Sequence, residues 1–354
     1  MNLNIIKRII KGILRPIAKP YFNRIRIILR EELTHNNQHR GVSLNNKNGY
    51  SVSTINAKPS TAIKTVKIST FAELDAFCDK YNRGDYDGLS FRDFLGKHYI
   101  SVSHFFKLYG SSPPKCDPFS DVYKDWEIGF FKFLYGREYS FNNEGVGISN
   151  YDKPPTYAHD LDKRVFSLRL YADFLNIVKP ISGMNIIEMG CGAGDLLELL
   201  GRCGCIVTGL DVNISDEGFA NYVKNRLTLQ NIKASVIAGD FFQLENISDL
   251  YDLIIFEASF HHCNDPVRLM RLLYIKLKPG GRIIFFREPF SNRYDRPWGV
   301  TRYDGMTMYF IRARGHMDFA HRNDFFEELL LRTGFSYKKH VLFDSSELYD
   351  VCKL

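Results

Sequence analysis

The chain of 354 residues lacks several features that would assign it to whole classes of protein. Its seven cysteines form no paired framework like those that cross-link small secreted domains, and no Cys/His spacing matches a structural zinc site. No uninterrupted apolar run approaches the roughly 20 residues that span a bilayer. Charges interrupt the apolar N-terminal stretch, which argues against a cleavable signal sequence. These absences favour a soluble protein in a reducing compartment, the cytoplasm.

The net charge of +7 is not spread evenly along the chain. Lysines and arginines crowd the first segment, where isoleucines recur at helical spacing, so we expect basic amphipathic helices over residues 1–33. Such a helix lies on the inner face of an anionic membrane, or it packs on the body of the protein or on a second subunit of a homo-oligomer. Because the excess charge is local, no nucleic-acid partner is expected.

Composition divides the rest of the chain. Residues 34–65 are rich in Asn, Ser, Thr and Lys and indicate a polar linker. Residues 66–160 are dense in aromatic residues and predict a mainly helical cap. Residues 161–354 alternate apolar runs with helical patterns, which predicts an α/β domain. Residues 288–322 form a long insertion within it, of the length expected for a lid or binding loop.

Three glycines at alternate positions follow an apolar run that contains an acid. The run from Asn185 includes Glu188, and Gly190, Gly192 and Gly194 come next, before a leucine-rich segment. This pattern predicts a buried strand that turns sharply into a helix, with a turn whose backbone can touch a bound molecule. The spacing differs from the G-x-G-x-x-G pattern that cradles a pyrophosphate. The preceding carboxylate suits a cationic amino group better than a phosphate.

Further apolar runs, each closed by an acid, follow in order. One ends in Asp211, about 20 residues beyond the first acid, where a carboxylate can accept hydrogen bonds from both hydroxyls of a ribose. Another ends in Asp240, which Phe241 follows, and a third delivers Glu257. The alternation predicts a doubly wound, mostly parallel sheet with ligands at the carboxyl ends of its strands.

From about residue 160 to residue 354, these motifs resemble the class I S-adenosylmethionine-dependent methyltransferases in order and spacing. Lys278-Pro-Gly-Gly281 also looks like the usual loop of that family before its fifth strand. The resemblance implies an enzyme with a Rossmann-like α/β fold and S-adenosyl-L-methionine as cofactor. It implies that Asp240 meets the adenine amino group, that Phe241 packs on the ring and that Glu257 holds the methionyl end. The expected cofactor-binding residues are Glu188, Gly190, Gly192, Gly194, Asp211, Asp240, Phe241 and Glu257.

Methyl transfer to a hydroxyl needs a general base beside the methyl group. His261 and His262 directly follow the fourth strand, where loops form the ligand crevice, and histidine titrates near working pH. Adjacent histidines point in different directions, so at most one serves as the base. Glu288, at the end of the fifth strand, is a rival, as is Glu257. No metal is expected, although metal-assisted deprotonation stays open as an alternative.

The insertion sets aromatic faces beside arginines and acids, a combination that suits a sugar. Its segment 311–316 and the basic N-terminus look like a group of bacterial methyltransferases of surface-polysaccharide synthesis. The leading hypothesis is O-methylation of a hydroxyl in a glycan or an activated sugar. The alternatives are a lipid-like small-molecule acceptor such as a quinone at the membrane, and a non-catalytic cofactor-binding scaffold. The expected substrate-binding residues are Trp298, Arg302, Tyr303, Asp304, Arg314 and His316.

Overall fold

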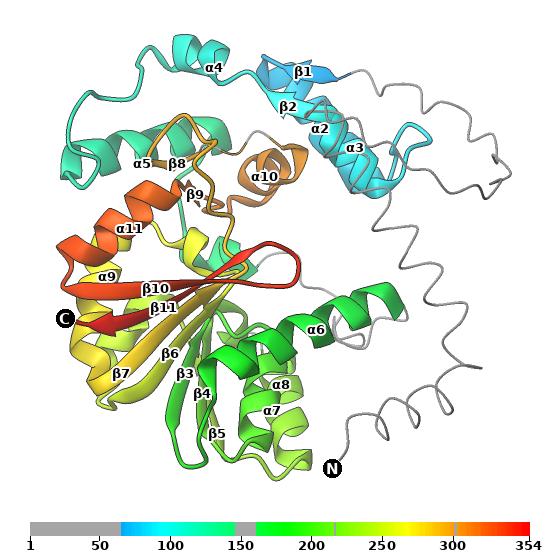
Figure 1. Ribbon diagram of the computed structural model, residues 1–354. Coiled ribbons are helices and arrows are strands. Elements are labelled where there is room, and N and C mark those ends of the chain that lie inside the picture. The colour runs from blue at the N-terminus through cyan, green and yellow to red at the C-terminus, as the bar shows by residue number, and fades with distance from the viewer. Residues whose placement is uncertain (1–64, 146–160, 216, 301, 303) are drawn as a thin grey trace, which may run out of the picture. The chain divides into compact units, whose positions relative to one another are not determined.

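The computed structural model describes residues 65–145, 161–215, 217–300, 302 and 304–354 (Figure 1). The predicted amphipathic helices of residues 1–33, and all but the last residue of the predicted linker, lie outside these ranges. Within them, no helix is both long enough and apolar enough to cross a bilayer.

Residues 65–145 are mainly helical, as expected of the cap. Two short parallel strands, β1 (Val66–Ile68) and β2 (His98–Ile100), pair beside the helices. The helical elements are α2 (Phe71–Arg83), α3 (Phe91–Lys97), α4 (Val102–Tyr109), α5 (Asp121–Tyr135) and η1 (Phe141–Gly145).

A seven-stranded sheet in the order β10-β11-β7-β6-β3-β4-β5 forms the centre of the C-terminal part (Figure 1). Its five parallel strands are β3 (Asn185–Met189), β4 (Ile206–Asp211), β5 (Ala234–Ala238), β6 (Tyr251–Glu257) and β7 (Leu277–Phe286). The strands β10 (Phe335–Val341) and β11 (Glu347–Lys353) pair antiparallel at one edge. The chain runs outward from β3 through β4 to β5 and then returns to β6, so the order reverses between β3 and β6. Ligands of doubly wound sheets bind at such a switch point.

Helices cover both faces of this sheet, which confirms the doubly wound Rossmann-like fold (Figure 1). Alternate residues of each strand point to opposite faces, so Ile186 packs with one set of helices and Ile187 with the other. One face carries α6 (Leu161–Val178), α7 (Asp195–Arg202) and α8 (Glu217–Leu229). The other carries α9 (Pro266–Lys276) and α11 (Asn323–Arg332).

The strand β7 is longer than the sequence predicts. The Lys-Pro-Gly-Gly segment, expected as a loop before the fifth strand, is part of the strand itself. Leu277 pairs with Tyr251, and pairing resumes at Arg282 opposite Leu253, so the segment forms an irregularity in the ladder. The glycines and the proline therefore interrupt the pairing without ending the strand.

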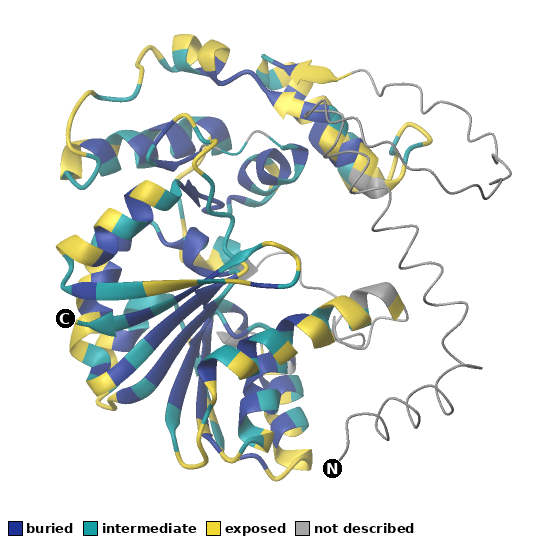
Figure 2. Cartoon of the chain, in the orientation of Figure 1, coloured by how far each residue is buried: buried dark blue, intermediate teal, exposed yellow. Residues whose placement is uncertain are grey.

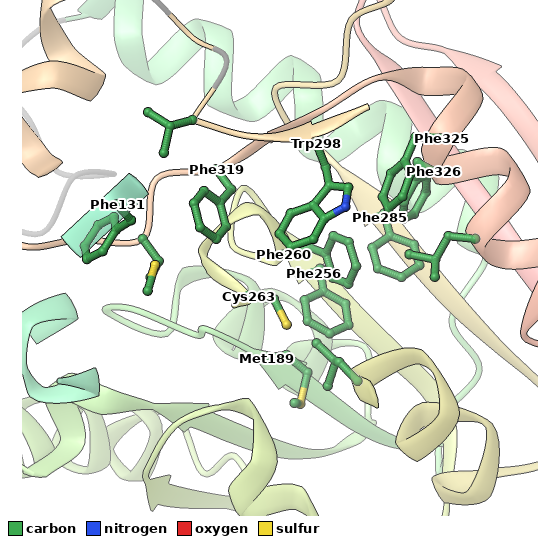
Figure 3. Packing of buried hydrophobic residues seen from close by; sticks show 14 of the residues in the cluster. Phe131, Met189, Phe256, Phe260, Cys263, Phe285, Trp298, Phe319, Phe325 and Phe326 are labelled. Carbon is green, nitrogen blue, oxygen red and sulfur yellow. The ribbon is translucent and has the colours of Figure 1, made fainter. Parts of the chain in front are cut away.

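One buried hydrophobic cluster joins the second face of the sheet to the N-terminal helices (Figures 2 and 3). The rings of Phe256 and Phe285 stack with centroids 5.0 Å apart, and Phe260 meets both edge-on. Trp298, from the insertion, packs edge-on against Phe319 with centroids 5.6 Å apart. The cluster includes residues of α5 and of the insertion, so the cap and the α/β domain share one hydrophobic core across the predicted boundary.

The insertion after β7 is ordered by a buried ion pair. It contains β8 (Trp298–Gly299), α10 (Gly305–Tyr309), η6 (Phe310–Arg314) and β9 (Ala320–His321). Arg296 of the insertion lies 2.6 Å from Glu127 of α5, and both side chains are almost fully buried. The backbone N–H of Val300 donates to the second oxygen of that carboxylate. Burial raises the pKa of Glu127 to about 7, although the guanidinium beside it works in the opposite direction.

Arg296→Met should lower the free energy of unfolding by about 3–5 kcal/mol, because it leaves the Glu127 carboxylate buried without its partner. The double variant Glu127→Gln, Arg296→Met should recover most of that loss, since no unpaired charge then remains in the core. Urea denaturation followed by tryptophan fluorescence measures both. An equal loss in the single and double variants would show that packing of the arginine, and not its charge, joins the insertion to α5.

Candidate active site

The turn after β3 brings backbone into contact with the loop after β6. Gly190 has φ +79°, and a Cβ at that position would stand 2.6 Å from the Cβ of Ser259. The hydroxyl of Ser259 donates to the carbonyl of Met189 at 2.6 Å. Gly192 has φ +49°, and a Cβ there would meet nothing within 4 Å. The first glycine therefore permits close packing of two loops, while the second faces open space.

Two of the predicted acids hold turns at the ends of their strands. Asp211 accepts a hydrogen bond of 2.8 Å from the backbone N–H of Gly192 and two from Asn213. Burial raises the pKa of Asp211, and those hydrogen bonds oppose the shift. Asp240 caps the 3-10 helix Phe241–Asn246 by accepting from the backbone N–H groups of Phe242 and Gln243 with one oxygen. Each carboxylate keeps acceptor capacity for a ligand.

A cavity of about 660 Å³ opens at these strand ends. One wall consists of the turns after β3, β4, β5 and β6, including Asp211 and Asp240. The opposite wall consists of the helical N-terminal part and the insertion. From these come Tyr81, Tyr139, Glu144, Arg302, Met306, Tyr309, Phe310, Arg314, His316 and Asp318.

Glu288 holds the loop after β6 through hydrogen bonds to its backbone. Its buried carboxylate accepts from the backbone N–H groups of Ser259, Phe260 and His261 at 2.9, 2.9 and 3.2 Å. It also lies 2.8 Å from Nδ1 of His261. Burial would raise the pKa of Glu288, but its hydrogen bonds and the histidine outweigh that effect and lower it. An ionised carboxylate can only accept, so the Nδ1–H of His261 donates and Nε2 is left for the cavity.

His262 has a different environment. Its Nδ1 lies 3.0 Å from Oε2 of Glu144, and the other oxygen of that carboxylate accepts from the backbone N–H of Met317. Burial would lower the pKa of His262, but the charge of Glu144 outweighs it and raises the pKa to about 9. This imidazole is therefore cationic at neutral pH.

A sequence family described as "Methyltransferase domain" matches residues 157–340, more than half of the chain. The chain belongs to this family. The expected class I enzyme dependent on S-adenosylmethionine is thereby confirmed. The cavity fits that cofactor, because Gly192 leaves its backbone uncovered, two carboxylates keep free acceptor capacity, and Phe241 lines the wall.

Curated relatives of this methyltransferase share only part of their length with it. A ubiquinone biosynthesis O-methyltransferase of Coxiella burnetii is 30% identical over 105 residues, which is 30% of this chain and 44% of the relative. A malonyl-[acyl-carrier protein] O-methyltransferase of Priestia megaterium is 31% identical over 148 residues, 41% of this chain and 48% of the relative. The chain thus spans less than half the length of these relatives.

Solved structures of methyltransferases are also similar to this one. A S-adenosylmethionine-dependent methyltransferase from Mesorhizobium loti has a TM-score of 0.41 and 18% identity, covering 58% of this chain and all of that one. The glycopeptide N-methyltransferase MtfA, complexed with S-adenosylmethionine, has a TM-score of 0.38 and 14% identity. The match covers 52% of this chain and 92% of that chain.

The cavity of this methyltransferase gathers many of the residues that the sequence singles out. Among the expected cofactor-binding and catalytic residues, those that line it are Gly190, Gly192, Asp211, Asp240, Phe241, His261 and His262. Among the expected substrate-binding residues, Arg302, Arg314 and His316 line it. Tyr303 lies outside the described residues.

Other predicted residues do not line the cavity. Gly194 caps α7, and Glu257 binds Tyr171 and Arg287. Glu188 is buried beneath the turn, with one carboxylate oxygen that has no hydrogen-bond partner. Burial raises its pKa well above the usual range.

The remaining two predicted substrate-binding residues contact other parts of the protein and do not line the cavity. Trp298 is buried in the core, where its Nε1–H donates to the carbonyl of Pro118. Asp304 caps α10 and pairs with Arg302 at 2.8 Å. Both sit in the insertion, as the sequence suggests, but neither lines the cavity.

Sequence reasoning missed Tyr81, Tyr139, Glu144 and Asp318. The first three come from the helical part, where they are indistinguishable in pattern from the many aromatic and acidic residues around them. Asp318 lies two residues beyond the predicted His316, but no motif marks it. In the described part of the chain, no group of three or more His, Cys, Asp and Glu side chains is arranged to hold a metal ion.

Cofactor binding can be tested at the turn after β3. Asp211→Ala should weaken binding of S-adenosylmethionine by about 1.5–3 kcal/mol, the range for hydrogen bonds to a charged group. Gly192→Val should abolish binding, because its side chain would fill the open space beside the turn. Isothermal calorimetry measures both, with NAD as the ligand that should not bind. Equal binding of NAD would contradict the assignment of the cofactor.

Proposed function

We propose that this methyltransferase transfers a methyl group to a hydroxyl of a sugar, in a glycan or an activated sugar, with His261 as the general base. The contact between His261 and Glu288 supports this role most directly. It fixes the ring, sets the tautomer with a free Nε2 and places a compensating negative charge behind the imidazole. These are the functions of a carboxylate that orients a catalytic histidine.

S-adenosylmethionine, when bound, supplies a methyl group on a sulfonium, which is an activated leaving group. When the acceptor oxygen takes that methyl group, Nε2 of His261 would accept the hydroxyl proton. The imidazolium that results is stabilised by Glu288, 2.8 Å from Nδ1. The protein therefore acts by orienting the hydroxyl and accepting one proton.

His262 does not suit the role of base. Its pKa of about 9 keeps it protonated at neutral pH, so it has no lone pair to offer a hydroxyl. We assign it a positioning role through Glu144, which it ties to the loop after β6 at 3.0 Å. Glu288, the third candidate, already uses both of its oxygens within the loop and does not line the cavity.

The acceptor side of the cavity supports a polar, polyhydroxylated substrate. Tyr81 and Tyr309 both line it and stack on each other, with ring centroids 3.6 Å apart. Arg302, Arg314 and Asp318 set charged hydrogen-bonding groups beside it. A sugar ring presents apolar C–H faces and a rim of hydroxyls, so it complements both kinds of surface.

Replacing the proposed base tests the mechanism. His261→Ala should lower turnover by about 10²–10⁴ while leaving the affinity for S-adenosylmethionine nearly unchanged, because it removes only the proton acceptor. His262→Gln, which keeps a hydrogen-bonding side chain, should lower turnover far less. Release of S-adenosylhomocysteine gives the rates. Normal turnover in His261→Ala would exclude this residue as the base.

The acceptor can be tested in the cell. Deletion of the gene should remove one methyl group, a loss of about 14 mass units, from a glycan of the host. Mass spectrometry of released glycans, with the gene restored as a control, detects the change. Glycans of unchanged mass would contradict the sugar assignment.

A second candidate acceptor is a quinol-like ring. The names of the curated ubiquinone biosynthesis relatives favour it, although they are matched over 44% of their length or less. The predicted basic helices of residues 1–33 would suit a lipid-like acceptor at a membrane surface. The chemistry at His261 would be the same, since a phenolic hydroxyl also loses its proton to the base.

A further inference from the structure

Asp318 is the second hydrogen-bond acceptor that faces the same point of the cavity as the proposed base. It lies in the segment between η6 and β9, is only 4% exposed and lines the cavity. One of its oxygens, Oδ1, lies 3.9 Å from Nε2 of His261. That separation is too long for a direct hydrogen bond between the two groups.

Arg302 and Thr307 contact this carboxylate and leave it room for another partner. Arg302 donates to Oδ1 of Asp318 at 3.4 Å and binds Asp304 more closely, with Nη2 at 2.8 Å and Nε at 3.0 Å. Burial would raise the pKa of Asp318, but His261 and Arg302 outweigh it and lower the pKa. Asp318 is thus an ionised carboxylate that can only accept hydrogen bonds.

Two acceptors, Nε2 of His261 and Oδ1 of Asp318, therefore converge on one place. A single hydroxyl has one proton and can donate to only one of them. Arg302 satisfies Oδ1 of Asp318 only with a long hydrogen bond of 3.4 Å, so the site is complementary to a ligand with two donors about the same distance apart. Two hydroxyls on neighbouring carbons have this arrangement.

We propose that Asp318, held by Arg302, binds the second hydroxyl of a vicinal diol, and so positions the first hydroxyl at His261 for methylation. This inference rests on the proposed O-methyltransferase function and narrows its substrate class. Asp318 is a specificity-determining residue in this scheme and takes no proton. Sugars and catechols both carry vicinal diols, so the experiment needs an arm for each.

The test measures kcat/KM for matched acceptors with the full chain and S-adenosylmethionine. The aromatic arm compares catechol with phenol, and the alicyclic arm compares cis-1,2-cyclohexanediol with cyclohexanol. Cyclohexylamine tests an acceptor whose N–H donors all sit on one atom. In at least one arm, kcat/KM for the diol should exceed kcat/KM for the mono-ol by about 10- to 100-fold. This is the effect of one hydrogen bond to a charged group. The arm with the larger preference identifies an aromatic or a sugar-like acceptor.

Asp318→Asn is the variant that decides the role of this carboxylate. It should reduce the diol preference to near unity, mainly through KM of the diol, and leave affinity for S-adenosylhomocysteine nearly unchanged. Asp304→Asn is the matched control. It removes another carboxylate that binds Arg302, but Asp304 does not line the cavity, so this variant should keep the diol preference. Unchanged cofactor affinity also shows that each variant is folded.

The outcomes separate the two proposals. If mono-ols and diols are methylated equally, or if Asp318→Asn keeps the preference, the diol inference is wrong and the O-methyltransferase proposal stands. If only cyclohexylamine accepts the methyl group, or no hydroxyl probe does, both are wrong. A diol preference that Asp304→Asn also abolishes would assign the effect to Arg302 and overturn the role of Asp318.

Discussion

The geometry of the candidate active site depends on one buried carboxylate at the end of β7. Glu288 must satisfy four acceptor sites away from water, and it does so with three backbone N–H groups and one imidazole from the loop after β6. That requirement fixes the position of His261 relative to the sheet. The insertion begins at this same residue. One set of hydrogen bonds therefore positions the proposed base, the loop after β6 and the start of the insertion relative to one another.

The acids at the other strand ends act in the same way. Asp211 and Asp240 each first satisfy backbone N–H groups of a neighbouring turn and only then have lone pairs left for a ligand. A carboxylate that already holds its turn is rigid before the cofactor arrives, so binding need not order it. This dual role explains why acids recur where apolar runs end, and why that pattern was readable from the sequence.

The sheet, its helices and the cofactor half of the cavity were predictable because their signals are local. Strand periodicity, the glycine turn at 190–194 and terminal acids all lie within short stretches of sequence. Only part of the acceptor half was predictable, namely Arg302, Arg314 and His316 of the insertion. The rest was not, since its partners lie far apart in sequence, as in the pair of Glu144 with His262. The same limit applies to Trp298, whose aromatic ring is typical of a sugar site but fills the core against α5 and the insertion.

The division of the cavity also explains why family membership settles the cofactor and not the acceptor. The turns after β3, β4, β5 and β6 lie within the family match, whereas Tyr81, Tyr139 and Glu144 lie before its first residue. Within the match, the acceptor wall comes from an insertion whose position is set by contacts with α5. The proposed cofactor contacts therefore come from the sheet and its turns, while the proposed acceptor contacts come from the helical part and the insertion. In the proposed mechanism, changes in the contact between those two parts would alter which hydroxyl reaches His261 without altering the chemistry at Nε2.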